Sequence, residues 1–329
     1  MPLPTEFELI DRIERQAKSA GVLADCLVTI GDDAAAYIPK NEAVILSTDA
    51  AIEKVHFDYS IMPASAVGFR SLAANVSDLS AMGSTPVGFL LSLVLNPKMP
   101  LKRLTATLAG MFDCAKKSAC PLMGGNISRT NGPLTIAITI IGEAKKNKLA
   151  LRKGAKPGDI IAVTGSVGDS YAGLMISLGR IRYTRQGALA LRRAYGFPPI
   201  RLSEGQLLAQ SGVSSMIDIS DGLLQDLGHI LKASGVGADL YADKIPLSKN
   251  LRNCAANLGE PPYRFALSGG EDYELLFTIP PEQFTILKRN YPIGFAPIAE
   301  IGVIRKSQGL SLYFRGEELH VEPSGWKHF

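Results

Sequence analysis

Hydrophobic residues along this chain recur at helical spacing in some segments and form short continuous runs in others. Residues 8–20 carry apolar side chains every three or four positions with charges between them, which predicts an amphipathic helix. Residues 43–47 are an apolar run with the composition of a short buried strand. We expect the polar continuation Ser47-Thr48-Asp49 at the end of that strand, where side chains reach a cleft.

The same two patterns continue through the first half of the chain. They predict helices at 65–82 and 101–118 and strands at 86–95 and 134–142. They also predict a glycine loop at 123–126. Strands and helices therefore interleave, which is typical of an α/β or α+β domain.

The best candidate for a domain boundary is the basic stretch that precedes Pro157. We therefore expect domains at 1–149 and 150–329, and the second repeats the alternation of strands and helices. Its predicted strands are 160–164, 217–219 and 274–279, with helices from about 171 and from 222. The fold class expected for the whole chain is two-domain α/β.

Composition narrows the class of protein without naming an activity. The 329 residues are 46% hydrophobic and 20% charged, with a net charge of only +4, so we expect a soluble globular protein and no nucleic-acid surface. The longest apolar stretch, near residues 87–95, is about half the length that a membrane helix needs. No secretory signal is recognisable, and four scattered cysteines without a C-x-x-C pair suit a reducing cytoplasm.

The strongest chemical signal is a set of acidic residues in apolar or glycine-rich surroundings. They are Asp32, Asp33, Asp49, Asp78, Asp218 and Asp221. Two carboxylates about 4 Å apart repel by roughly 4 kcal/mol at a protein-like dielectric, so a convergent cluster requires cations. Carboxylates mixed with hydroxyls such as Ser47 and Thr48 favour Mg²⁺, and Mg²⁺ beside glycine loops favours phosphoryl transfer.

Some of these acids also have a simpler, structural interpretation. Ser220 or Asp221 can cap the helix predicted from residue 222, although Asp218, lying between two isoleucines of a strand, has no such role. Asp78 can belong to a solvated helix face. Asp32 and Asp33 cannot point the same way in an extended chain, so we expect one of them as a ligand.

Other candidates for ligand contacts are spread along the chain. The glycine pairs at 124–125 and 269–270 let backbone approach a ligand, but are also ordinary turns, and the sequence has neither a P-loop nor a dinucleotide fingerprint. His56 can contact a substrate or be structural. Arg152 can clamp a phosphate or be solvated, and Trp326 can stack on a heterocycle or fill a core gap.

Together these segments resemble the thiamine-monophosphate kinase family, within the superfamily that includes aminoimidazole ribonucleotide synthetase. The matching stretches are Gly31-Asp32-Asp33-Ala34, Ser47-Thr48-Asp49, His56-Phe57, residues 75–83, residues 154–159, residues 218–223 and residues 268–275. The resemblance covers nearly the whole chain. It implies transfer of the γ-phosphoryl group of ATP to thiamine monophosphate, with several Mg²⁺ ions and no assigned catalytic base.

The resemblance also implies residue roles. The metal positions are Asp33, Ser47, Thr48, Asp49, Asp78, Asp218 and Asp221. The nucleotide contacts are Gly125, Asn126, Arg152 and Ser220, and the substrate contacts are His56, Glu271 and Trp326. The implied architecture is an N-terminal domain whose strands form a barrel across a homodimer and a C-terminal α/β domain that closes over nucleotide and substrate.

One residue departs from the family pattern, and two alternatives stay open. Asn126 stands where the family commonly has Asp, which removes a charge and predicts a more weakly held metal. The first alternative is another ATP-using member of the superfamily. The second is a non-catalytic nucleotide-binding protein, which is expected to have lost several acidic ligands.

Overall fold

The computed structural model describes residues 5–24, 26, 30, 37–183 and 185–319. The chain divides into two compact units. The first consists of Met1–Leu79 and Ser84–Lys146, and the second of Ser80–Gly83 and Asn147–Phe329. Among the described helices, none combines the length and the apolar character needed to cross a membrane.

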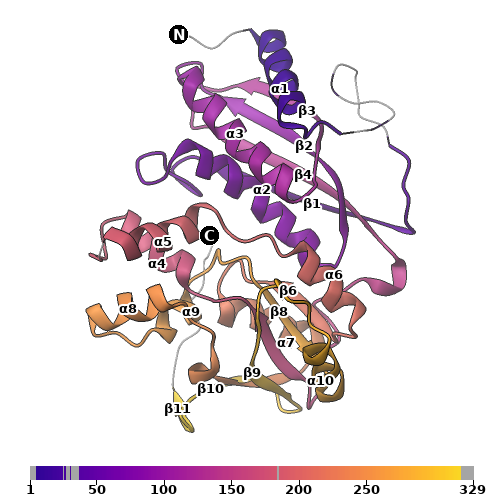
Figure 1. Cartoon of the computed structure of the whole chain (residues 1–329), viewed down its shortest axis with the longest axis vertical. Coiled ribbons are helices and arrows are strands. Elements are labelled where there is room, and N and C mark those ends of the chain that lie inside the picture. Colours follow the sequence, from indigo (N-terminus) through magenta and orange to yellow (C-terminus); the bar gives the residue numbers. More distant parts are fainter. Residues whose placement is uncertain (1–4, 25, 27–29, 31–36, 184, 320–329) are drawn as a thin grey trace. The chain divides into compact units, whose positions relative to one another are not determined.

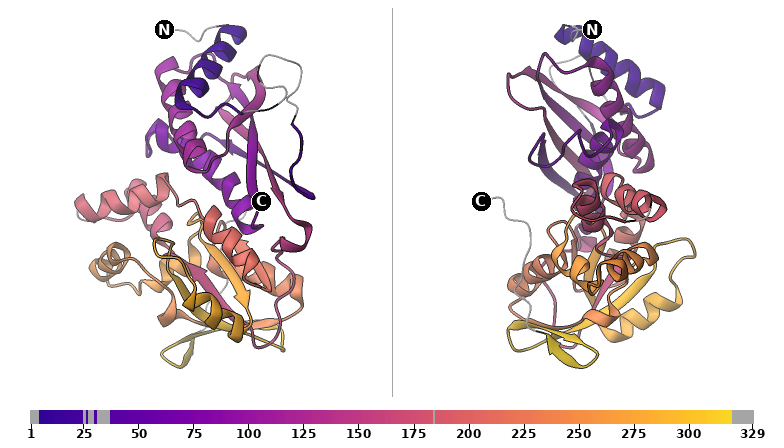
Figure 2. Two further views of the ribbon diagram at one scale, coloured as in Figure 1. Left: turned by 45° about the vertical axis from the view of Figure 1, so that its right-hand side comes forward. Right: turned by 90° about the vertical axis from the view of Figure 1, so that its left-hand side faces the viewer.

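The first unit contains a four-stranded mixed sheet in the order β1-β4-β2-β3. Its strands are β1 (Ala43–Ile52), β2 (Thr85–Leu95), β3 (Leu122–Arg129) and β4 (Thr135–Ala144). β4 is antiparallel to both neighbours, whereas β2 and β3 are parallel. The helices α1 (Glu6–Ala20), α2 (Ala64–Ala81) and α3 (Leu101–Lys117) lie on one face of this sheet (Figures 1 and 2).

The two faces of this sheet differ in burial. On β4, Ile136, Ile138 and Ile140 are almost fully buried under the helices, because alternate residues of a strand point to one face. On the opposite face of β1, Val44 is 45% exposed and Leu46 is 67% exposed. Part of this second face is therefore apolar and uncovered in the single chain.

Two sequence predictions were wrong in this unit. β1 continues to Ile52, since it pairs with β4 over its whole length, so Ser47-Thr48-Asp49 lies within the strand and not at its end. The predicted glycine loop at 123–126 is part of β3. A side chain on Gly125 would overlap the carbonyl group of Leu91 on β2, so this glycine permits a close approach of two strands.

The second unit contains a seven-stranded mixed sheet in the order β11-β10-β7-β9-β5-β8-β6. Its strands are β5 (Ile160–Thr164), β6 (Ser215–Asp218), β7 (Gly237–Tyr241), β8 (Leu275–Ile279), β9 (Ile298–Arg305), β10 (Gly309–Phe314) and β11 (Glu317–Leu319). Its helices are α4 (Asp169–Ser177), α5 (Arg185–Gly196), α6 (Leu202–Gln210), α7 (Leu223–Ser234), α8 (Lys249–Leu258), α9 (Tyr263–Ser268) and α10 (Pro281–Arg289).

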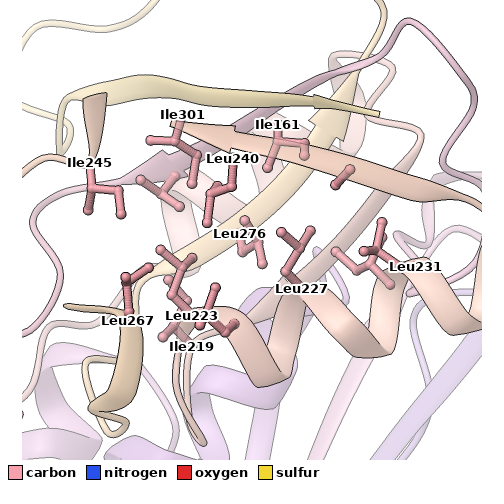
Figure 3. Packing of buried hydrophobic residues seen from close by; sticks show 14 of the residues in the cluster. Ile161, Ile219, Leu223, Leu227, Leu231, Leu240, Ile245, Leu267, Leu276 and Ile301 are labelled. Carbon is pink, nitrogen blue, oxygen red and sulfur yellow. The ribbon is translucent and has the colours of Figure 1, made fainter. Parts of the chain in front are cut away.

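Helices cover both faces of this sheet. On one face, Leu223 and Leu227 of α7 pack in one cluster with Ile161, Leu276 and Ile301 of the strands (Figure 3). On the other face, side chains of α6 and α10 pack against residues of β6 and β8. Since this core fixes both β6 and α7, it also fixes the ends of the turn that joins them.

Candidate functional site

The first group of candidate residues lies where β1 meets α2. Ser47 and Asp49 are two positions apart on the same face of β1, about 7 Å along the strand. The Ser47 hydroxyl donates a hydrogen bond of 2.5 Å to Asp78 Oδ2 of α2. The structure therefore brings Ser47 and Asp78 into contact and places Asp49 beside them on the strand.

A buried amide on the same helix has an unpaired oxygen atom within the described part of the chain. Asn75 is 1% exposed and lies one turn before Asp78, and its Nδ2 donates to the carbonyl oxygen of Ser71. Its Oδ1 has no hydrogen-bond partner among the described residues. An unpaired buried carbonyl oxygen is costly, and a bound cation or its water would satisfy it. The oxygen-only donors here are of the kind that Mg²⁺ prefers.

Thr48 does not join this group through its side chain. Because successive residues alternate along β1, its side chain lies on the opposite face of the sheet. Its hydroxyl donates to the carbonyl oxygen of Ile138 at 3.0 Å and lies 3.1 Å from the hydroxyl of Thr139. Any contribution of Thr48 to a cation beside Asp49 therefore falls to its carbonyl oxygen.

His56 lies in the turn that follows β1 and is partly buried. Its Nδ1 accepts a hydrogen bond of 3.1 Å from the backbone N–H of Ile52. The bond fixes the orientation of the ring and assigns Nδ1 as an acceptor, so that the neutral imidazole carries its proton on Nε2.

Gly125 and Asn126 lie on β3, at the other edge of the sheet from β1. Three strand spacings separate the two edges, about 14 Å in all. Asn126 is exposed and its Nδ2 donates to the hydroxyl of Ser128 at 3.1 Å. Within one chain, these two residues therefore do not join the group at Ser47 and Asp78.

The second group lies on the turn between β6 and α7. Asp218 is the last residue of β6 and is 3% exposed, as the sequence predicts for an acid on a buried strand. Ser220 and Asp221 follow in the turn and are partly exposed. The simpler reading of Ser220 or Asp221 as a helix cap does not hold, because the N-cap of α7 is Gly222.

Asp226, which was not among the residues predicted from the sequence, organises this turn. Its Oδ2 accepts three backbone hydrogen bonds, from the N–H groups of Ser220, Asp221 and Gly222, at 3.0, 3.1 and 3.0 Å. Burial raises the pKa of Asp226 to about 7, in spite of these bonds, which act to lower it. The N–H of Ser220 is therefore occupied, and only its hydroxyl is available for a ligand.

A histidine adds a nitrogen donor at the same turn. Among the residues that the structure describes, Asp221, Asp226 and His229 each offer a ligand atom, and these atoms lie within 4.8 Å of one another. His229 is exposed, whereas Asp226 is buried. Asp221 and His229 are thus groups that can bind a divalent cation, and they lie beside the buried carboxylate of Asp226.

Glu271 reaches this turn from the loop that precedes β8. Its backbone N–H donates to the carbonyl oxygen of Ser220 at 2.8 Å, and its φ of 67° is in the left-handed region. A Cβ atom on Gly270 would overlap the same carbonyl group. The glycine is thus explained by the close approach of two loops, which places Glu271 beside Ser220 and Asp221.

The next two acids of this loop have structural partners. Asp272 is 4% exposed and accepts N–H bonds from Gly168 and Ser170 at the start of α4, and burial raises its pKa. Glu274 is held by Arg201 through two bonds of 2.6 Å. Neither residue is a candidate for substrate contact.

Of three other predicted residues, the structure describes only Arg152. Arg152 is exposed, and the carbonyl oxygen of its neighbour Leu151 accepts the N–H of Met216, which brings Arg152 alongside β6. Asp33 and Trp326 fall outside the described residues.

Comparison with known proteins identifies relatives over the full length of the chain. Residues 31–144 match the family model of the AIR synthase related protein, N-terminal domain, and residues 156–314 match that of its C-terminal domain. The thiamine-monophosphate kinase of Aquifex aeolicus (strain VF5) is 34% identical over 324 residues, 98% of each chain.

Solved structures agree in fold. That of thiamine-monophosphate kinase from Stenotrophomonas maltophilia K279a superposes with a TM-score of 0.82 at 34% identity, over 97% of this chain and 99% of the other. AaThiL complexed with AMPPCP and TMP gives a TM-score of 0.78 at 32% identity, over 98% and 97%. The two-domain α/β fold implied by the sequence resemblance is therefore confirmed.

Proposed function

The chain belongs to the AIR synthase related family and, within it, to the thiamine-monophosphate kinases, and we propose that it phosphorylates thiamine monophosphate to thiamine diphosphate with ATP. The observation that carries this proposal is the full-length similarity to such kinases, one of which was solved with AMPPCP and TMP. The acid and hydroxyl groups on β1, α2 and the β6–α7 turn support it. Loss of several acids, expected of a non-catalytic relative, is not found in the sequence.

The residues proposed to hold Mg²⁺ all offer oxygen atoms. They are Asp33, Ser47, Thr48 through its carbonyl group, Asp49, Asp78, Asp218 and Asp221. Bound Mg²⁺ would neutralise the phosphate oxygens and let carboxylates approach them. The nucleotide contacts proposed are Gly125, Asn126, Arg152 and Ser220.

The chain's own groups then bind and orient the two substrates. Asp226 accepts the N–H of Ser220, so the group that Ser220 offers to a ligand is its hydroxyl. Arg152 offers a planar fork of donors that fits phosphate oxygens. Glu271 supplies a carboxylate, which suits the cationic ring of thiamine. His56, with its proton on Nε2, can donate to the substrate, and Trp326 can stack on it.

No residue is needed as a strong base in this reaction. The acceptor is a phosphate that is largely ionised near neutral pH, so its oxygen is already a nucleophile. What the protein must supply is in-line positioning and compensation of charge. The residues above are therefore assigned to binding and orientation alone.

We propose that the first unit forms a homodimer through the uncovered face of its sheet. Val44 and Leu46 leave apolar area on that face. Two copies supply eight strands, and about eight strands close a barrel that side chains fill. Light scattering should then give the mass of a dimer, and Leu46→Lys should give a monomer; a wild-type monomer would contradict the proposal.

We also propose how the metal, dimer, nucleotide and substrate contacts divide between the two domains. The first domain, with a boundary near residue 149, carries metal ligands and the dimer contact, and the second carries the nucleotide and substrate contacts of Arg152, Ser220 and Glu271. A cytoplasmic location suits the four cysteines, which are all free thiols.

The experiment that tests the activity is incubation with ATP, Mg²⁺ and thiamine monophosphate, with products identified by mass. Wild-type protein should form thiamine diphosphate and ADP. Asp218→Asn and Asp221→Asn should lose turnover by about a hundredfold or more while the folded content stays unchanged. ADP without thiamine diphosphate would favour another ATP-using member of the superfamily, and near-wild-type rates in either variant would contradict the metal assignment.

A further inference from the structure

A single carboxylate holds the backbone of the β6–α7 turn. Asp226 lies on the first turn of α7 and is 1% exposed. Its Oδ2 accepts the N–H groups of three consecutive residues, Ser220, Asp221 and Gly222. Such a set of N–H groups at the start of a helix is an anion-binding nest, and here an internal carboxylate fills it.

Helix capping alone does not account for an acid at this place. A serine or threonine at the N-cap satisfies helix N–H groups without burying a charge. Asp226 is instead buried close to the carboxylate of Asp221, which is electrostatically unfavourable. The arrangement fixes the backbone conformation of residues 220–222, because a carboxylate that is buried in the fold accepts their N–H groups.

The turn is fixed from its other side as well. The carbonyl oxygen of Ser220 accepts the N–H of Glu271 at 2.8 Å, and the side chain of Gln225 donates to Asp221 Oδ2 at 3.1 Å. Asp226 is thus the group that holds the N–H side of the turn, while the loop before β8 holds the carbonyl side. Without Asp226, three backbone N–H groups, one of them buried, would lose their acceptor, and the turn could rotate.

Resting on the function proposed above, we propose that Asp226 is a positioning residue. It holds Ser220 and Asp221 in the orientation that binds the divalent cation and the nucleotide, without itself binding either. Its role depends on an oxygen acceptor at the position of Oδ2 and not on its charge.

The test compares two substitutions in the full-length protein. Asp226→Asn keeps a carbonyl oxygen that can accept the N–H bonds, whereas Asp226→Leu has the same branching and number of side-chain heavy atoms but no acceptor. Binding of Mn²⁺, used in place of Mg²⁺, is measured from the electron paramagnetic resonance signal of the free ion. We expect Asp226→Leu to raise the Kd for Mn²⁺ by about tenfold or more. Asp226→Asn should raise it by less than about threefold.

Turnover provides a second measurement. In Asp226→Leu the KM for ATP should rise together with the Mn²⁺ Kd, whereas in Asp226→Asn the KM for ATP should stay close to the wild-type value. If both variants lose Mn²⁺ equally, Asp226 is a metal ligand and the proposal is wrong. If Asp226→Leu binds Mn²⁺ like the wild type, its role is only structural and the proposal is also wrong.

A matched control is Asp159→Leu. Asp159 is a buried carboxylate of the same unit, 4% exposed, that also accepts a backbone N–H, from Lys156 at 2.8 Å. It should lose stability and keep the wild-type Kd for Mn²⁺. Should Asp226→Leu fail to fold, Asp226→Ser takes its place, since its hydroxyl is too short to reach all three N–H groups. The Mn²⁺ measurement requires no turnover, so it is independent of whether the proposed kinase activity is found.

Discussion

Replacement of Arg201 by alanine should strongly destabilise the second unit. Arg201 binds Glu274 with two hydrogen bonds of 2.6 Å, and the two side chains are 19% and 5% exposed. Thr164 donates a third bond to the same carboxylate at 2.6 Å. Because Glu274 precedes β8 and Thr164 ends β5, these contacts tie the loop that carries Glu271 to the central strands.

The magnitude follows from burial. Removal of one partner of a buried pair leaves an uncompensated charge and costs about 3–5 kcal/mol. The pair of Arg305 and Asp239 is the control, since its side chains are 29% and 26% exposed and its atoms lie 2.9 Å apart. A more exposed pair contributes about 0.2–1 kcal/mol, so Arg305→Ala should cost much less.

The assay is urea denaturation with hydrogen exchange measured on peptides that cover β5 and β8. Arg201→Ala should lower the urea midpoint and raise exchange in these strands, and Arg201→Lys should lie between it and the wild type, because lysine lacks the planar fork. A loss in Arg201→Ala no greater than that in Arg305→Ala would refute the reasoning.

Three further predictions concern single residues. Burial raises the pKa of Asp272, so the folded state binds its proton more tightly than the unfolded state, and the contribution of this group to stability should fall as pH rises above about 4. Between acidic and neutral pH, the urea midpoint of Asp272→Asn should therefore fall less than that of the wild type. Equal falls in the two proteins would count against this prediction. Gly125→Ala should cost about 1–3 kcal/mol, because its Cβ would overlap Leu91; an unchanged melting temperature would show that β2 and β3 can move apart freely. Asn126→Asp should tighten Mg²⁺ binding, measured by calorimetry, since it restores a charge; an unchanged or weaker affinity would refute this.

Much of the fold could be predicted because hydrophobic periodicity is local. The strand β5 has the predicted limits, and the helices α2 and α3 lie within a residue or two of theirs. The strands β1 and β3 were less predictable because their limits depend on pairing. The polar residues 47–49 belong to β1 because they pair with β4, and Gly125 belongs to β3 because it packs closely against β2. The local sequence does not reveal either pairing strand.

The candidate site shows the same division. Asp218 and Asp78 could be recognised because an acid among apolar residues is unusual, and the contact between Ser47 and Asp78 agrees with that reading. Asp226 was missed because an acid on the first turn of a helix is commonplace. Only the structure shows that it is buried and bound to three backbone N–H groups of a neighbouring turn.

The central claim is direct phosphoryl transfer from ATP to thiamine monophosphate, and an isotope measurement tests it most directly. The protein is incubated with Mg²⁺, thiamine monophosphate and ATP labelled with ³²P at the γ position, and the products are separated. We predict that the label appears in thiamine diphosphate in the same amount as ADP is formed, and that Asp221→Asn abolishes both. Label released as inorganic phosphate, with thiamine monophosphate unchanged, would contradict the account.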